Sequence, residues 1–515
     1  MLSQVLSSAT YGIDAYLVSV ETHIENGIPP QISIVGLPDN AVKESRERVS
    51  AAIKNSAYLF PPHKKITVNL APADVKKEGS AYDLPIAVGI LSATDQVGNE
   101  VLKDFVMLGE LALDGTLRPV HGSLPVAIEV RQKSLRGVIL PKENAREAAM
   151  VDGVEVYPMG SLSETVDFLN GEYEMLNPFK VDLQEIFTQE QKYAVDFADV
   201  KGQENVKRAL EVAAAGGHNI IMIGPPGSGK TMLAKRLPTI LPPLTFDEAL
   251  ETTKIHSIAG LLPPNTALVA TRPFRSPHHT ISDSALVGGG TIPKPGEISL
   301  AHHGVLFLDE LPEFARNVLE VMRQPMEDAH VTISRSRMSV DFPSSFMLVC
   351  AMNPCPCGYF SDPSKECTCT PPQIQKYMAK ISGPLLDRID LHIEVPAVKY
   401  KELASKSSGE NSTAIRERVM KAREVQGSRF RGRKGLYCNA DMQSKDIKEF
   451  CQIDEHGEEL LKMAITKLGL SARAYDRILK VSRTIADLGG SERIKPEHVS
   501  EAIQYRSLDR NLWIG

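Results

Sequence analysis

Eight consecutive residues, 224–231, constrain the fold of this chain more than any other stretch. They read Gly224-Pro225-Pro226-Gly227-Ser228-Gly229-Lys230-Thr231 and match the phosphate-binding pattern G-x-x-x-x-G-K-[ST] without a mismatch. An apolar run at 220–223 enters the loop, and residues 232–237 leave it as a helix that we expect to stop at Pro238. A strand, a glycine loop and a helix in this order direct backbone N–H groups and a positive helix end at a phosphate. The sequence therefore predicts a nucleotide-binding fold, in place of an ordinary glycine turn.

The residue types in and beyond this loop predict how a nucleotide would be held. Lys230 would reach the β/γ-phosphates, and the Thr231 hydroxyl would bind Mg²⁺. Downstream, the apolar run 305–308 predicts a buried strand that ends in Asp309 and Glu310. In a phosphate-loop enzyme the first of two such acids supports Mg²⁺, and the second can polarise the attacking water. We therefore expect ATP and Mg²⁺ as cofactors.

A third apolar run and an arginine complete this set of candidate residues. Residues 346–352 predict another buried strand, which ends at Asn353, and a polar amide at that place can orient the same water. Arg388 follows within the segment 385–390. From the residues alone, Arg388 could equally form an ordinary surface ion pair.

Composition limits the classes to which the chain can belong. At 515 residues it exceeds what one hydrophobic core normally serves, so we expect two to four domains. Its 42% hydrophobic and 24% charged residues are typical of soluble globular proteins. The net charge of −6 gives no overall basic footprint, so any contact with DNA must come from local loops. There is no apolar run of 18 residues and no basic leader-like start, so we expect a cytoplasmic protein without membrane contact.

Residues 1–170 alternate strand-like and helix-like patterns and predict an α/β domain without a phosphate loop of its own. Strands are expected at 32–35, 66–70 and 137–141, and a hairpin turn at Asp114-Gly115. Helices are expected at 83–91, beyond Asn144, and after Asn40, which we expect to act as an N-cap. Residues 171–195 are polar and irregular, as suits a linker.

Three segments of this domain, 77–84, 115–122 and 138–144, resemble the proteolytic domain of the Lon family, a fold also present in the recombination protein RadA. In Lon a lysine activates a serine, and the resemblance puts the serine position at Ala81 and the lysine position at Leu124. Neither side chain can attack a carbonyl group or accept a proton. Ser80 is one residue away and would point elsewhere. The resemblance therefore implies a scaffold without peptidase activity.

The chain as a whole resembles the AAA+ ATPases, and most closely their magnesium-chelatase-like branch with the ComM/YifB family. The specific stretches are Arg-Pro-Phe-Arg-Ser-Pro-His-His-Thr at 272–280 and Pro-Lys-Pro-Gly-Glu-Ile-Ser-Leu-Ala-His-His-Gly at 293–304. The resemblance implies an α/β fold class that combines three parts. These are a Lon-protease-like (ribosomal S5 domain 2-like) domain at 1–170, a P-loop AAA+ core at 196–397 and an α-helical lid at 398–515.

The same resemblance implies roles for individual residues. Glu310 would be the base that activates water, and Asn353 would be the sensor 1 residue. Arg388 would be the arginine finger that reaches the ATP of a neighbouring subunit. Arg473 matches the sensor 2 position, at the start of a helix that Ser471 would cap. The family further implies a homo-oligomeric ring, a hexamer, that acts on branched or single-stranded DNA in homologous recombination during natural transformation.

Two long segments of the core predict functional loops. Residues 255–300 are rich in Pro, Gly and His, and the resemblance implies an insertion there that faces a central pore. Residues 326–346 could form a β-hairpin with Arg335 and Arg337 near its tip. Loops of this length tend to be functional, although two solvated loops are the plain alternative.

Helical patterns dominate the chain beyond 398. One stripe of apolar residues should end at Gly427, a second helix should start at Ser471, and a third should start near Pro496. The apolar stripe before Gly427 consists of Ile415, Val419, Ala422 and Val425. A basic group between helices could contact phosphates or be a solvated loop; it comprises Arg429, Arg431, Arg433 and Lys434.

Four of the seven cysteines lie close together as Cys355, Cys357, Cys367 and Cys369. Four thiolates within this interval could form a tetrahedral zinc site. The usual pairs of zinc ligands leave two residues between them, whereas these pairs leave one. The pattern is therefore compatible with a zinc site or with four reduced thiols. We expect the other three cysteines to be structural.

Three functions remain open at this point. The first is the DNA motor of the ComM/YifB family. The second is a magnesium-chelatase-like motor that remodels a protein partner, against which we count the N-terminal domain, since the chelatase motor subunit lacks it as a family. The third is a Lon-type peptidase, against which Ala81 and Leu124 argue.

Overall fold

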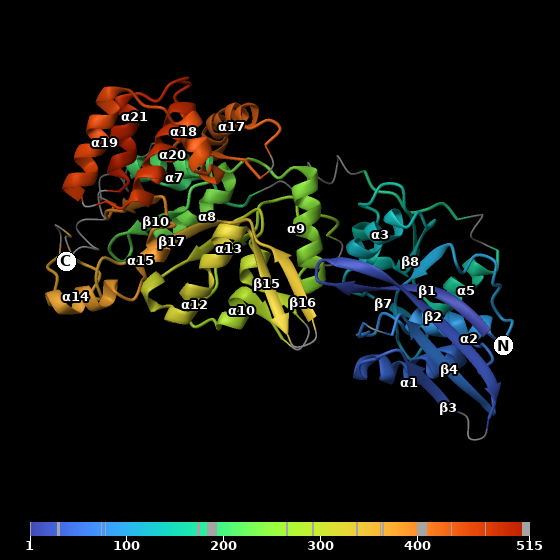
Figure 1. The fold of residues 1–515 in the computed structure, drawn as a ribbon. Helices are drawn as coiled ribbons and strands as arrows, with labels where there is room; N and C mark the ends of the chain where they lie inside the picture. The colour runs from blue at the N-terminus through green and yellow to red at the C-terminus, as the bar shows by residue number, and fades with distance from the viewer. Residues whose placement is uncertain are drawn as a thin grey trace. The chain divides into compact units, whose positions relative to one another are not determined.

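The computed structural model describes residues 2–506 apart from 28–30, 74, 78, 172–175, 183–192, 264–265, 291–292, 336–337, 361, 363–364, 399–408, 434 and 469. The chain forms two compact units (Figure 1). The first consists of Met1–Glu190 and Phe246–Val269, and the second consists of Gln191–Thr245 and Ala270–Gly515. Much of the linker expected at 171–195, together with Arg337 and Lys434, lies outside the described residues.

The first unit is built on a seven-stranded mixed sheet in the order β3-β4-β2-β1-β5-β8-β9. β2 pairs antiparallel with both β1 and β4, and the other neighbours in the sheet pair in parallel. A small hairpin turns at Asp114-Gly115, as predicted. The strands are β1 (Leu2–Tyr11), β2 (Asp14–Asn26), β3 (Gln31–Val35), β4 (Lys64–Ala71), β5 (Phe105–Met107), β6 (Glu110–Leu111), β7 (Leu117–Arg118), β8 (Gly137–Pro141) and β9 (Glu155–Met159).

The helices of the N-terminal domain supply the rest of its core. Every residue of α2 (Asp83–Ser92) is buried, because the helix is almost entirely apolar. The N-cap of α1 (Asn40–Asn55) is Asp39 and not Asn40, so the predicted cap was wrong by one residue. Asp39 has an extended backbone, and its carboxylate accepts the N–H of Val42 at 2.8 Å. The remaining helices are α3 (Ser123–Gln132), α4 (Ala145–Ala148) and α5 (Leu162–Leu169).

Helix α9 (Phe246–Ala259) lies far along the chain but belongs to the first unit. Its Ser257 hydroxyl accepts the N–H of Gly122 at 3.0 Å and donates to the buried carboxylate of Glu147. Glu147 also accepts the Ser123 hydroxyl and the N–H of Leu124. Polar groups from three segments therefore satisfy one another around a buried acid, which fixes α9 against the start of α3.

The second unit contains a five-stranded parallel sheet in the order β11-β14-β17-β10-β18. Ile223, the last residue of β10, is level with Met352 of β17. Because parallel strands point the same way, the loops that follow β10, β14 and β17 leave the same edge of the sheet. The strands are β10 (Ile220–Ile223), β11 (Phe274–Arg275), β14 (Val305–Leu308), β17 (Met347–Met352) and β18 (Leu391–Glu394).

Helix α8 (Lys230–Ile240) continues past Pro238, so the prediction that it stops there was wrong. The proline lies in the last turn, where its missing N–H removes only one hydrogen bond. The expected hairpin is present as β15 (His330–Arg335) and β16 (Met338–Pro343). The other elements of this part are α7 (Glu204–Gly216), α10 (Asp283–Val287), β12 (Gly288–Gly289), β13 (Lys294–Pro295), α11 (Glu297–Leu300), η4 (Leu311–Glu313), α12 (Arg316–Val321), α13 (Arg323–Asp328), α14 (Pro371–Met378) and α15 (Gly383–Leu386).

The C-terminal part is helical, as predicted. Helix α17 (Ser412–Arg429) runs through Gly427, and Val425 is exposed while Gln426 is buried, so both the predicted end and the last position of the apolar stripe were wrong. The Gln426 amide replaces an apolar contact by donating to the carbonyl of Ala215 at 3.0 Å. The other helices are α18 (Ser444–Phe450), α19 (Glu455–Leu468), α20 (Ala472–Leu488) and α21 (Pro496–Gln504).

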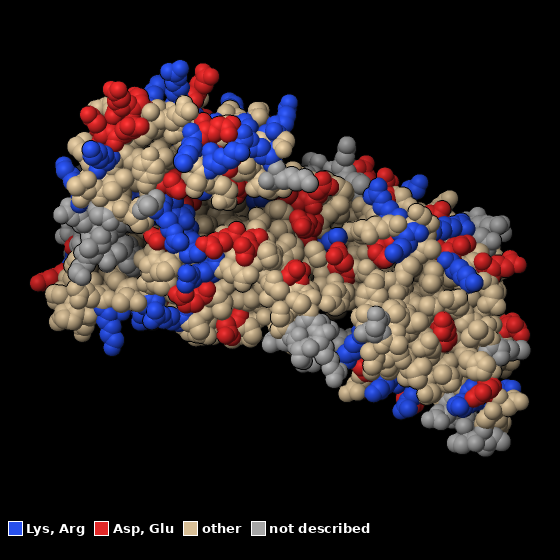
Figure 2. Space-filling model, in the orientation of Figure 1, with Lys and Arg blue, Asp and Glu red and all other residues tan. Residues whose placement is uncertain are grey.

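Charge is distributed without a single dominant sign. On the face drawn in Figure 2, Lys and Arg side chains are interspersed with Asp and Glu side chains in both units. Two of the basic residues singled out between the helices are neutralised locally, since Arg429 pairs with Asp487 and Arg433 with Asp446. Among the described residues, no helix combines the length and apolar character needed to cross a bilayer.

Candidate active site

The phosphate loop 224–231 connects β10 to α8 through positions that require glycine. Gly227 and Gly229 have φ angles of +77° and +89°, in the left-handed region that favours glycine. A Cβ atom on Gly224 would lie 2.1 Å from the carbonyl oxygen of Val395, which directly follows the neighbouring strand β18. The loop therefore folds tightly against the sheet edge, and α8 begins directly from it.

Lys230 is held inside this loop and is only 8% exposed. Its Nζ atom donates to the carbonyl oxygens of Gly224 at 2.7 Å and Pro225 at 3.0 Å, and to Oδ1 of Asn353 at 3.3 Å. Burial lowers the pKa of Lys230, and the nearby Asp309 carboxylate opposes this shift. A phosphate group in the loop would supply the buried ammonium with a counter-ion, so the donor set fits a nucleotide.

Thr231 and Asp309 meet at the sheet edge. The Thr231 hydroxyl donates to Oδ2 of Asp309 at 2.6 Å, which joins the start of α8 to the end of β14. Hydroxyl and carboxylate oxygens are ligands that Mg²⁺ prefers. The pair therefore offers two magnesium ligands directly beside Lys230.

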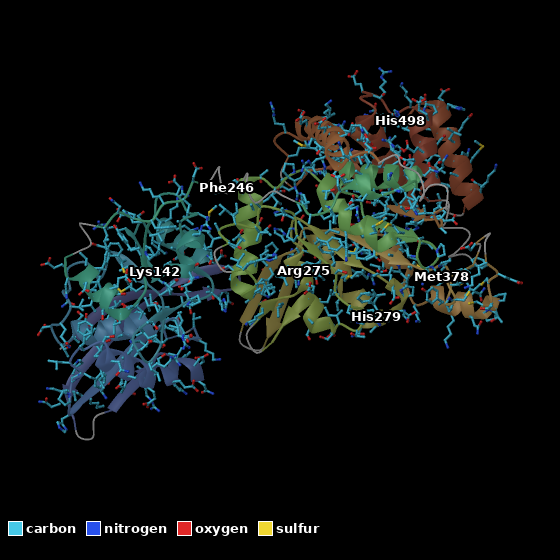
Figure 3. All side chains as sticks on the ribbon, turned by 180° about the vertical axis from the view of Figure 1, so that it is seen from behind. Lys142, Phe246, Arg275, His279, Met378 and His498 are labelled. Atoms are coloured by element: carbon cyan, nitrogen blue, oxygen red, sulfur yellow. The ribbon has the colours of Figure 1, made fainter. Side chains whose placement is uncertain are left out.

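Glu310 has an unusual backbone and an exposed carboxylate. Its φ angle is +54°, uncommon for a residue with a side chain, and the side chain is 59% exposed. Nδ1 of His279, labelled in Figure 3, lies 3.4 Å from its Oε2 atom. His279 belongs to the stretch 272–280 that carried the family resemblance, but the sequence analysis gave it no role of its own. Its place in that stretch is the sequence feature that could have marked it as a candidate site residue.

The two stretches that carried the resemblance also contact each other. Arg275, labelled in Figure 3, forms a bidentate ion pair with Glu297, with both N–O distances at 2.7 Å. Arg272 donates to the carbonyl oxygens of Pro242 and His303. These contacts fix the segment that carries His279, so its position beside Glu310 follows from the surrounding structure.

Arg388 lies between α15 and β18 and is 9% exposed. It donates to the carbonyl oxygen of Pro384 at 2.6 Å and pairs with the carboxylate of Glu327 in its own chain. Its position on the chain matches the resemblance, and its action on a neighbouring subunit stays a prediction. Such an action requires the Glu327 pair to open or to lie within reach of the neighbour.

Arg473 lies in the first turn of α20, and Ser471 caps that helix by accepting the N–H of Ala474 at 3.2 Å, as predicted. The Arg473 side chain is 64% exposed and lies 3.6 Å from Asp387. Asp387 precedes Arg388 in the chain, but the Arg388 guanidinium pairs with Glu327. Lys230, Thr231, Asp309 and Asn353 are brought together by the hydrogen bonds given above.

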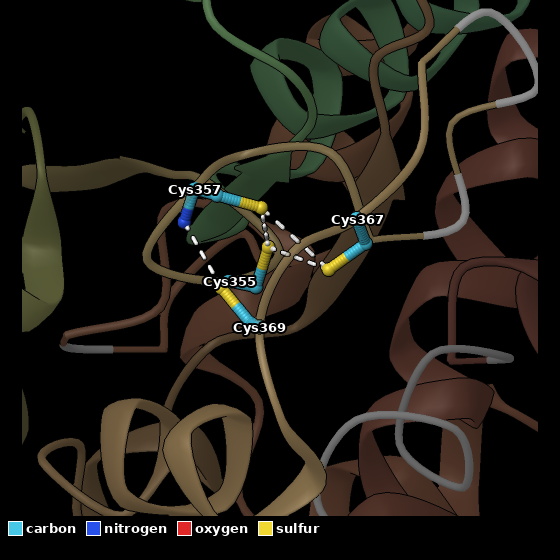
Figure 4. A group of neighbouring side chains, drawn as sticks. All are labelled: Cys355, Cys357, Cys367 and Cys369. Atoms are coloured by element: carbon cyan, nitrogen blue, oxygen red, sulfur yellow. Dashed lines mark hydrogen bonds between the residues drawn. The ribbon is translucent and has the colours of Figure 1, made fainter.

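The four clustered cysteines come together between β17 and α14 (Figure 4). Sγ of Cys355 lies 3.3 Å from that of Cys357 and 3.7 Å from that of Cys367. One ligand atom from each of the four residues falls within 4.8 Å of all the others. None of the seven cysteines forms a disulfide, and the remaining three, Cys350, Cys438 and Cys451, are buried.

The two positions that correspond to the catalytic serine and lysine of Lon, Ala81 and Leu124, carry neither a nucleophile nor a proton acceptor. Leu124 is fully buried, and its backbone N–H donates to Glu147 at 3.0 Å. The carbonyl oxygen of Ala81 accepts the N–H of Gly109, and the Ser80 hydroxyl donates to Glu110. Ser80 therefore pairs with an acid and not with a lysine.

Comparisons with known proteins agree with this architecture. Family models described as "Magnesium chelatase, subunit ChlI", "Subunit ChlI of Mg-chelatase" and "Magnesium chelatase, subunit ChlI C-terminal" match residues 196–403, 20–144 and 409–506. The chain is 47% identical to the competence protein ComM of Haemophilus influenzae over 512 residues, which are 99% of this chain and 98% of that protein. It is 45% identical to the YifB protein of Escherichia coli over 513 residues, with the same two coverages.

Two further relatives match about a quarter of the chain. The chain is 32% identical over 122 residues to the DNA repair protein RadA of Aquifex aeolicus, covering 24% of this chain and 26% of RadA. It is 30% identical over 126 residues to Lon protease 2 of Bacillus subtilis, covering 24% of this chain and 22% of the protease. These partial similarities agree with the predicted Lon-like fold of residues 1–170.

The parallel sheet, the phosphate loop and the two acids after β14 define an ATPase of the AAA+ class, of the magnesium-chelatase type. ATP and Mg²⁺ are the cofactors that this class implies. The chain belongs to the ComM/YifB family, as its length-spanning identity to ComM shows.

Proposed function

We propose that the protein is an ATP-driven ring motor, a hexamer, that acts on branched or single-stranded DNA. In this proposal it is a branch-migration helicase that supports homologous recombination in natural transformation, in the cytoplasm. The observation that carries the proposal is the 47% identity, over almost the whole of both chains, to a protein named for competence.

The residues around the phosphate loop would divide the work of hydrolysis. Lys230, Thr231 and Asp309 would hold Mg-ATP, and Glu310 would accept a proton from the attacking water. Asn353, already 3.3 Å from Lys230 Nζ, would keep that water in line with the γ-phosphate. His279 would orient the Glu310 carboxylate through the 3.4 Å contact.

Arg388 and Arg473 would serve the ring. A guanidinium that approaches the γ-phosphate stabilises charge that develops during hydrolysis. Arg473 contacts Asp387 and Arg388 pairs with Glu327, so neither guanidinium takes part in the hydrogen bonds around Lys230. We therefore propose that Arg388 acts on the neighbouring subunit and that Arg473 senses the γ-phosphate.

A magnesium-chelatase-like motor that remodels a protein partner is the second candidate. The descriptions of the three matching family models favour it, and one of them covers residues 20–144. The presence of the N-terminal domain therefore does not separate the two functions, contrary to the argument from sequence. The near-complete alignment with ComM is the reason for preferring the DNA motor.

ATP turnover measured with forked DNA, single-stranded DNA and a folded protein control separates these candidates. The DNA motor should be stimulated several-fold by DNA and not by the control protein. Equal turnover in all three conditions would refute the DNA proposal. A parallel assay on unfolded protein should show no cleavage, whereas cleavage that disappears in Ser80→Ala would restore the peptidase candidate.

A further inference from the structure

The four sulfur atoms of the cysteine cluster have the spacing of a single metal's ligand shell. A tetrahedral Zn²⁺ with bonds of about 2.3 Å holds its sulfurs about 3.8 Å apart. Three pairs here lie at 3.3, 3.6 and 3.7 Å, and the four atoms fall within 4.8 Å of one another. The sulfurs of an iron–sulfur cluster would be further apart, because several irons lie between them. One ion therefore fits this cluster.

Backbone groups support the sulfurs in the way that the surroundings of metal sites do. The N–H of Phe360 donates to Sγ of Cys355, and the N–H of Cys357 donates to Sγ of Cys369, both at 3.3 Å. Such N–H donors stabilise thiolates and orient them toward a metal. The described residues between β17 and α14 form neither helix nor strand, so a metal would supply order that the backbone does not.

The cluster is joined directly to the phosphate loop. Gly358, in the turn that Cys355 and Cys357 begin, has a φ angle of +86°, and a Cβ atom there would lie 2.5 Å from Cδ of Pro226. The turn therefore rests on the phosphate loop itself. Asn353, two residues before Cys355, accepts a hydrogen bond from Lys230 at 3.3 Å.

The other end of the cluster is fixed as well. Cys369 is followed at once by Thr370, the N-cap of α14. Tyr377 of that helix lies close to the backbone of Asn353. The four cysteines therefore lie in the segment between Asn353 and α14, and α14 packs back beside Asn353. A metal bound by the cysteines would restrict the movement of this segment and so fix the position of Asn353.

We propose that one Zn²⁺, bound by Cys355, Cys357, Cys367 and Cys369, braces Asn353 against the phosphate loop. The metal is a positioning element for hydrolysis, and the four thiolates supply its whole ligand shell. The inference rests on the ATPase activity and not on the action on DNA. A protein that hydrolyses ATP but ignores DNA would leave it intact.

Metal content is the first test. Protein purified without chelators should hold about one zinc per chain, and a Cys367→Ser, Cys369→Ser double variant should hold none. Cys438→Ser is the matched control, because its thiol lies outside the cluster and donates to Asp441 at 3.2 Å, a contact that a hydroxyl can keep. It should retain the zinc. Wild-type protein that contains no metal, or iron in place of zinc, would overturn the proposal.

Steady-state kinetics test whether the bound Zn²⁺ positions Asn353 for hydrolysis. In the double variant, kcat should fall at least tenfold while the affinity for a fluorescent ATP analogue changes by less than threefold, since Lys230 and Thr231 stay in place. Wild-type protein stripped of zinc under reducing conditions should lose turnover in the same way and regain it with added Zn²⁺, which separates the effect from misfolding of the variant. Stripped protein that keeps its full kcat would refute the positioning role.

Discussion

Nδ1 of His279 lies 3.4 Å from Oε2 of Glu310, so the proposed catalytic base is contacted by a residue 31 positions earlier in the chain. The contact joins the segment after β11 to the end of β14, two neighbouring strands of the parallel sheet. The Glu310 side chain is otherwise well exposed. An imidazole at this place can hold the carboxylate in one orientation.

We predict that His279→Ala lowers kcat by about tenfold, less than the roughly 10²- to 10⁴-fold that general-base catalysis contributes as a whole, because the base itself remains. The affinity for ATP should change by less than twofold, because the phosphate loop is untouched. His279→Gln, which can still donate a hydrogen bond, should recover most of the rate. Faster turnover in His279→Ala would show instead that the histidine restrains the base.

Substitutions of Lys230 and Glu310 should affect different steps, nucleotide binding in one case and hydrolysis in the other. Lys230→Ala removes the charge beside the β/γ-phosphates, so the protein should no longer bind ATP. Glu310→Gln keeps the shape but cannot accept a proton, so it should bind ATP normally and hydrolyse it about 10² to 10⁴ times more slowly. Nucleotide binding and phosphate release, measured on both variants, check this. Near wild-type turnover by Glu310→Gln would remove Glu310 from the mechanism.

Glu147 should matter for stability because it satisfies several donors in the first unit. In Glu147→Ala, the N–H of Leu124 and the hydroxyls of Ser123 and Ser257 lose their acceptor. Leaving buried polar groups unsatisfied costs roughly 1–3 kcal/mol for each such group. The midpoint temperature for thermal unfolding of the first unit should therefore fall by several degrees. Glu143→Ala, at an exposed position on the same domain, is the control and should not shift it.

Substitution of Arg388 tests whether the ATP site is shared between neighbouring subunits of a ring. Donors supplied in trans to phosphoryl transfer are worth roughly 10³- to 10⁵-fold in rate, so Arg388→Ala should bind ATP and hydrolyse it very slowly. Mixing it with Lys230→Ala creates interfaces that pair an intact phosphate loop with an intact arginine. Part of the ATPase activity should then return. No recovery, although mixed rings form, would show that Arg388 does not act across the interface.

The nucleotide-binding part of the fold followed from sequence because its signals are local. The phosphate loop, the apolar strands at 305–308 and 346–352, and the polar residues at their ends need only neighbouring residues to be recognised. Contacts between distant segments could not be predicted in that way. The pairing of His279 with Glu310 and the attachment of α9 to the N-terminal domain depend on how separate segments fold back on each other.

The errors have equally local causes. The two longest strands of the N-terminal sheet, β1 and β2, were not predicted, because their buried positions include Ser3, Ser7 and Thr22 and so weaken the apolar alternation. Helix α17 continued past Gly427 because a glycine lowers helix stability without forcing an end. The structure corrected these bounds.

Unwinding of a labelled forked DNA by the purified protein, with ATP and Mg²⁺, tests the proposed function most directly. We predict that the wild-type protein separates the strands and that Glu310→Gln, assembled on the same fork, does not. The expected rate falls with rising salt, because contacts with DNA phosphates weaken as counter-ions compete. Active ATP hydrolysis without strand separation or branch migration on any fork would contradict the DNA motor and leave the protein-remodelling candidate in its place.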